Sequence, residues 1–101
     1  MNQGAALHYI ATRQEFTASA LSGKTYWFTS NTGRLNEQES ALLIAEFGEG
    51  KSVYVVYSYG TPIAWHTLDG WYIVAQKFSV TTSKHQNYVR RAISSELVGA
   101  N

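Results

Sequence analysis

The chain has 101 residues, of which 45% are hydrophobic, 14% aromatic and 15% charged, and it contains no cysteine. This length suits a single domain (residues 1–101), and the aromatic content with the low charge argues against a disordered chain. The absence of cysteine excludes disulfides and thiolate sites, and a net charge of +1 is too small for a general nucleic-acid binder.

The N-terminal third is predicted to hold a strand, a helix and a second strand. Leu7–Ile10 is a short apolar run that we expect to be a strand. Thr12 and Glu15 have the spacing of a capping box, which predicts a helix over residues 13–21. The β-branched and aromatic run Thr25–Thr29 predicts the next strand.

A second helix is predicted over residues 37–47. Asn36 and Glu39 again have the capping-box spacing, and Leu43 belongs to an apolar stripe at helical intervals. Gly48 follows the last apolar position, where a glycine often ends a helix.

The middle of the chain favours strands joined by tight turns. Gly60 separates the first two runs, and Leu68-Asp69-Gly70 provides a short connection before the third. Residues 52–80 therefore predict an antiparallel three-strand meander. Its strands are expected at Ser52–Tyr59, Pro62–Thr67 and Trp71–Val80.

The last predicted element is a basic helix over residues 84–98. Ser83 and Gln86 form the third capping-box pair. Residues 1–70 hold four basic and six acidic side chains, whereas residues 71–101 hold four basic and one acidic. The fold class is thus α+β: an antiparallel sheet containing the meander, two earlier short helices and a C-terminal basic helix.

Half of the fourteen aromatic residues fall within residues 54–78. Because side chains alternate across a strand, aromatic and β-branched residues occupy both faces of the meander, and neither face is plainly polar. Either helices cover both faces, so that the rings fill the core, or one face contacts another chain or a ligand. The residues predicted to contact a partner are Tyr57, Tyr59, Trp65 and Trp71.

Two segments of the chain resemble a known signature. Tyr57–Trp65 reads YSYGTPIAW and Phe78–Gln86 reads FSVTTSKHQ, with Trp71 between them. This pattern resembles small uncharacterised proteins found in phages of actinobacteria and in their hosts, although Phe78 stands where the signature has tyrosine. The resemblance implies a phage-encoded accessory protein that acts in the host cytoplasm. It implies no catalytic residue and no cofactor.

The start of the basic helix is a candidate anion site. Free amides and the positive end of the helix dipole favour an anion there, and hydroxyl and basic side chains could contact a phosphate, a nucleotide or a nucleic acid. The alternative is that Ser83 only caps the helix and the arginines lie on a solvated face. The residues of this candidate site are Thr82, Ser83, Lys84, His85, Arg90 and Arg91.

We find no pattern that predicts an enzyme, a metal site or a cofactor. The three histidines, His8, His66 and His85, lie far apart and form no short-spaced metal motif. No apolar run approaches the roughly 20 residues that span a bilayer, and the N-terminus lacks a secretory signal. We therefore expect a non-catalytic cytoplasmic protein that binds a host protein or itself through the aromatic sheet. Nucleotide or nucleic-acid binding at the basic helix is the alternative.

Overall fold

The computed structural model describes residues 3–18, 20–29, 31–47, 51–76, 78 and 80–99. Three helices and a five-stranded sheet with strand order β1-β2-β3-β4-β5 form an α+β fold. Every neighbouring pair of strands is antiparallel. The elements are α1 (Gln3–Ala11), β1 (Phe16–Thr17), β2 (Leu21–Tyr26), α2 (Glu37–Glu46), β3 (Val53–Ser58), β4 (Thr61–Thr67), β5 (Gly70–Ile73) and α3 (Val80–Gly99).

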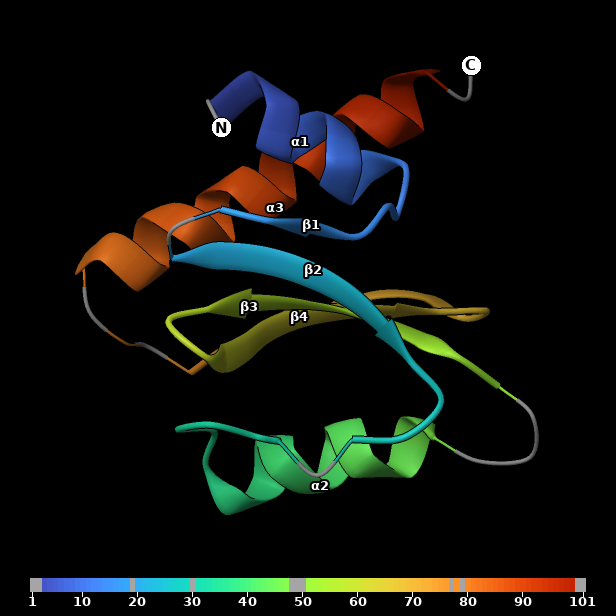
Figure 1. Ribbon diagram of the computed structural model, residues 1–101, viewed down its shortest axis with the longest axis vertical. Helices are drawn as coiled ribbons and strands as arrows, with labels where there is room; N and C mark the ends of the chain where they lie inside the picture. Colours follow the sequence, from blue (N-terminus) through green and yellow to red (C-terminus); the bar gives the residue numbers. More distant parts are fainter. Residues whose placement is uncertain are drawn as a thin grey trace.

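Helices cover both faces of the sheet. Helices α1 and α3 lie on one face and α2 lies on the other (Figure 1). The alternation of side chains along β3 divides the core accordingly: Tyr54 and Val56 pack toward α1 and α3, whereas Val53, Val55 and Tyr57 pack in a second cluster that contains Leu43 of α2. Of the two alternatives for the aromatic meander, the structure shows the one in which helices cover both faces.

The predicted meander and the predicted second helix are confirmed. Strands β3, β4 and β5 follow one another in the sheet, although β5 ends at Ile73 rather than Val80. Helix α2 begins after Asn36, whose side-chain Oδ1 accepts a hydrogen bond from the Glu39 N–H at 2.8 Å. Gly48, the predicted end of that helix, lies outside the described residues.

Two of the three predictions for the N-terminal third were wrong, and the third is right in part, because the strand predicted over Thr25–Thr29 shares Thr25 and Tyr26 with β2. Leu7–Ile10 lies in α1, and the helix predicted over residues 13–21 is replaced by a turn, β1 and the start of β2. A short apolar run does not by itself distinguish a strand from a buried helix. The proposed capping pair is also used differently: the Thr12 hydroxyl donates to the His8 carbonyl at the end of α1, and Glu15 Oε2 accepts from the Thr25 N–H.

Trp65→Ala should destabilise the fold by about 3–5 kcal/mol, because the ring is 1% exposed and its removal leaves a large cavity. The matched control is Trp27→Ala, since Trp27 is 67% exposed and should cost less than about 1 kcal/mol. Urea unfolding followed by circular dichroism measures both values. Equal losses for the two variants would contradict the position of the core.

Candidate functional site

The turn between β3 and β4 carries an exposed aromatic ring in a strained backbone conformation. Ser58 pairs with Thr61, so the turn consists of Tyr59 and Gly60. Their φ angles are 52° and 80°, the positive values that two-residue hairpin turns of the primed types require. Glycine adopts such angles freely, whereas a bulky residue there costs about 1–2 kcal/mol. The Tyr59 side chain is nevertheless 60% exposed, so burial of its ring does not account for the cost.

Hydrogen bonds from two other segments hold this turn. The Tyr59 N–H donates to the Ala20 carbonyl at 2.8 Å, next to β2. The Thr61 hydroxyl oxygen accepts from the Arg34 N–H at 3.0 Å, in the segment before α2. Gly33 lies so close to Thr61 that a Cβ at that position would clash with the Thr61 backbone. A strained residue persists where its surroundings fix its conformation, and these contacts do so.

Directly beneath the turn, a buried polar cluster joins β3 to α3. Ser58 Oγ lies 2.6 Å from His85 Nδ1 and 3.2 Å from Thr82 Oγ1. Ser58 and Thr82 are each 1% exposed and His85 is 9% exposed. The β3–β4 turn and the start of α3 lie at the same end of the molecule (Figure 1). Because a buried hydroxyl without a partner would be costly, these hydrogen bonds fix α3 against the hairpin.

The Tyr59 ring covers His85 in a stacked arrangement, with centroids 6.0 Å apart and planes inclined by 28°. Tyr88 packs against the same imidazole at 5.8 Å. Burial, together with the neighbouring Lys84 ammonium, lowers the pKa of His85 below its ordinary value, so the ring is neutral at pH 7. We call residues 58–61 and 80–85 the Tyr59 corner.

The Ser58–His85 pair has the residue types of a nucleophile and its general base. Its geometry favours a structural role, because the Ser58 hydroxyl is buried and cannot reach a substrate from this position. The sequence alone did not single out Ser58. Its place in the first resembling segment, with His85 in the second, was the signal that could have linked the two.

Of the four residues predicted to contact a partner, two are core residues, which corrects that prediction. Trp65 is buried and stacks on Tyr72 at 4.8 Å, and Tyr57 is buried with its ring edge-on to Tyr26. Burial raises the pKa of the Tyr57 hydroxyl above its ordinary value. Trp71 is half-buried, which leaves Tyr59 as the exposed member of the set.

The predicted anion site is also corrected, because α3 begins at Val80 and Ser83 is not its cap. Thr82 and His85 point into the buried cluster rather than toward solvent, and Ser83 is half-buried. Gln86 does not return to the helix start, since its side-chain amide donates to the Val74 carbonyl at 3.0 Å. The exposed remainder of the predicted site is Lys84, Arg90 and Arg91.

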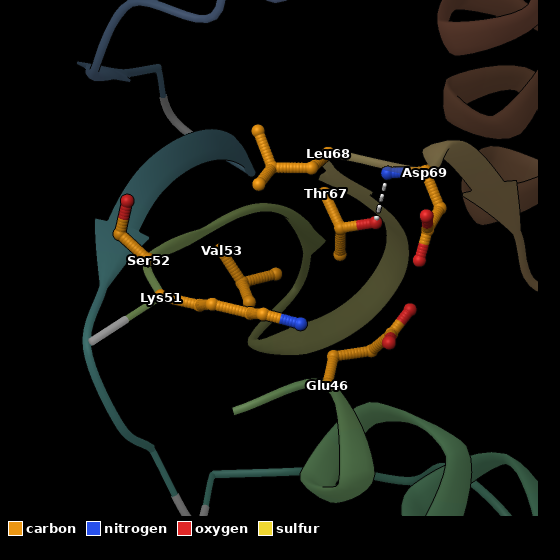
Figure 2. Close-up of a pocket in the computed structure, with 7 residues that line it drawn as sticks. All are labelled: Glu46, Lys51, Ser52, Val53, Thr67, Leu68 and Asp69. Carbon is orange, nitrogen blue, oxygen red and sulfur yellow. Dashed lines mark hydrogen bonds between the residues drawn. The ribbon is translucent and has the colours of Figure 1, made fainter. Parts of the chain in front are cut away.

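A pocket of about 330 Å³ lies at the other end of the sheet, between α2, the start of β3 and the β4–β5 turn (Figure 2). Glu46, Asp69 and Lys51 line it together with Ser52, Val53, Thr67 and Leu68. None of these lining residues is a histidine or a cysteine, so the lining offers neither a general base that titrates near neutral pH nor a thiol. It contains no residue of either predicted site.

In the part of the chain that the structure describes, the helices are too short or too polar to cross a bilayer. This part of the chain also brings together no group of three or more histidine, cysteine, aspartate or glutamate side chains that could bind a metal ion.

These features define a small three-layer α+β domain with an exposed aromatic turn above a buried polar cluster. A family model described as a family of unknown function (DUF8033) matches residues 7–96, and the chain belongs to that family. The match includes both segments of the Tyr59 corner. No curated protein and no solved structure matched the chain.

The stability of the fold should decrease as the pH falls through about 6.5, the ordinary pKa of histidine. The pKa of His85 is lower in the folded chain than in the unfolded chain. Below about pH 6.5 the imidazole is therefore protonated more readily in the unfolded chain, and this protonation favours unfolding. Thermal melts between about pH 5 and 7 measure this slope, and His85→Gln should flatten it. His8→Gln, on the exposed side of α1, is the control. An unchanged slope in His85→Gln would contradict the assignment.

Proposed function

We propose that this protein is a non-catalytic binding module of the phage accessory type, which contacts a host protein in the cytoplasm through the Tyr59 corner. The single observation that supports the proposal is the exposed Tyr59 ring, held at a φ of 52°. Local stability favours asparagine or glycine at this turn position. A tyrosine at this position, against that preference, supports a binding role for its exposed ring, because strained residues cluster at binding sites.

The residue type supports a protein partner. Tyrosine is enriched among the residues that dominate binding energy at protein interfaces, since its ring gives a large contact area at a small cost in side-chain entropy. Stacking on His85 restricts the Tyr59 ring before any partner arrives, which lowers that cost further. In the α3 part of the corner, Val80 and Lys84 are both exposed, so the corner offers an apolar and a positively charged side chain.

Tyr59→Asn should weaken partner binding strongly while leaving the fold intact. Asparagine tolerates the positive φ, and this relief offsets the lost stacking on His85, so the stability should change by less than about 1 kcal/mol. The affinity should fall by about 30-fold or more, the typical effect of truncating an aromatic anchor. The measurement is quantitative capture from nuclease-treated lysate of an actinobacterial host, followed by titration of the captured protein.

The matched control is Leu68→Asn, which removes a 93% exposed side chain from the β4–β5 turn. Proteins captured by the unchanged chain and by Leu68→Asn, but not by Tyr59→Asn, support the proposal. If every captured protein binds all three forms equally, the Tyr59 corner is not the contact surface.

A second candidate function is nucleic-acid binding along the outer face of α3. Lys84, Arg90 and Arg91 are all exposed there, and the helix has no acidic residue between Val80 and Ser94. The Arg90 guanidinium donates to Asn87 at 3.0 Å on the helix surface, which leaves its remaining donors available for phosphate. A row of cations without acidic neighbours favours a polyanion.

Fluorescence anisotropy with labelled single- and double-stranded DNA measures this second function. Lys84→Ala with Arg91→Ala should weaken binding and make the logarithmic salt dependence shallower by about 2, because each substitution removes about one cation that neutralises a phosphate. Lys51→Ala, an exposed lysine at the other end of the sheet, is the control and should have no effect. Equal affinities for all three forms would exclude α3 as the nucleic-acid surface.

A further inference from the structure

A run of aromatic rings leads from the β3–β4 turn onto the side of α3. The Tyr59 ring stacks on His85 with centroids 6.0 Å apart, and the same imidazole contacts the ring of Tyr88 at 5.8 Å. Tyr59 is exposed and Tyr88 is half-buried, so the two tyrosines flank the buried imidazole. The aromatic surface of the Tyr59 corner therefore continues from the turn along the first part of α3.

Two exposed cations lie beside these rings. Burial and then the Lys84 ammonium lower the pKa of His85, which shows that this ammonium lies near the imidazole. Arg91 follows Tyr88 by three residues and Lys84 by seven, and residues at these spacings share one side of a helix. The helical rise separates the two exposed cations by about 10 Å along the axis of α3. The surface next to the corner is therefore basic as well as aromatic.

The described elements on this side of the sheet supply no carboxylate that would balance the two cations. Helix α1, which packs on α3, contains no aspartate or glutamate, and neither do residues 58–61 and 80–94. Glu15 follows α1 but accepts from the Thr25 N–H, four residues along β2 from the end of that strand nearest the corner. The acidic side chains of α2 lie on the opposite face of the sheet (Figure 1). This uneven distribution attracts an acidic partner to the α3 side of the molecule.

We propose that the protein partner of the Tyr59 corner presents an acidic segment, in which an apolar side chain packs on Tyr59 and carboxylates pair with Lys84 and Arg91. This inference rests on the proposed function and adds the chemistry of the partner to it. Carboxylates about 10 Å apart match the two cations, a spacing that positions i and i+7 of a helix or i and i+3 of a strand provide. The Arg91 guanidinium can bind such a carboxylate through two parallel hydrogen bonds.

The small number of cations favours an acidic protein segment over a nucleic acid at this surface. Affinity for nucleic acids rises with the number of phosphates that a protein neutralises, and the exposed cations of α3 (Lys84, Arg90 and Arg91) neutralise only about three. A protein interface needs fewer charges, because a few residues supply most of its binding energy and tyrosine and arginine are enriched among them. An exposed tyrosine with an arginine and a lysine beside it has this composition.

Selection from a random peptide library displayed on phage tests the partner's chemistry directly. Peptides selected on the unchanged chain should be enriched in aspartate and glutamate next to an apolar residue. Lys84→Glu with Arg91→Glu should bind these peptides about 30-fold more weakly, and a selection on this variant should enrich lysine and arginine instead. Both side chains are exposed, so the variant should fold, which circular dichroism checks. Lys51→Glu reverses an exposed charge at the other end of the sheet and should change the affinity by less than about twofold.

The outcomes separate this inference from the proposed function. Selected peptides that lose affinity in Tyr59→Asn but contain no excess of acidic residues would overturn the inference and leave the proposed function standing. Acidic peptides that bind Tyr59→Asn as tightly as the unchanged chain would contradict both. Labelled oligothymidylate, measured by fluorescence anisotropy, is the competing probe. If it displaces the peptides and binds more tightly than they do, or if the library yields no binding peptide, the inference is overturned.

Discussion

The complete burial of β3 is the constraint on which the rest of this structure depends. All six of its residues are buried, so both faces of the strand must be covered by other elements. Side chains alternate between the two faces, which divides the core into one cluster under α1 and α3 and another that includes Leu43 of α2. In the part of the chain that the structure describes, the helices therefore leave neither face of β3 open to a partner. A partner that contacts the sheet itself must then reach its ends or its edges, and the exposed Tyr59 ring lies at one such end.

The Tyr59 corner connects two segments that are separated in the sequence but act as one physical unit. Ser58 belongs to the first resembling segment, and Thr82 and His85 belong to the second. A buried hydroxyl needs its hydrogen bonds, so the position of α3 relative to the β3–β4 turn is fixed by this cluster. The same cluster supports the imidazole on which Tyr59 stacks. The two halves of the signature therefore belong together because each completes the hydrogen bonds of the other.

Periodicity and local capping predicted the parts of the fold that local interactions determine. The Asn36–Glu39 pair begins α2, and the alternation of residues 53–57 predicted that apolar side chains lie on both faces of the sheet, as the two core clusters show. The failures came from contacts between distant residues. Glu15 has capping-box spacing but accepts from Thr25, and Gln86 has the same spacing but donates to the Val74 carbonyl.

Ser58 was missed because a small polar residue in an apolar strand shows no pattern until its partner on α3 is known. Tyr57 and Trp65 belong to a segment rich in aromatic residues, which the sequence shows directly. Whether their rings are exposed depends on packing against α2 and Tyr72, which the sequence does not show.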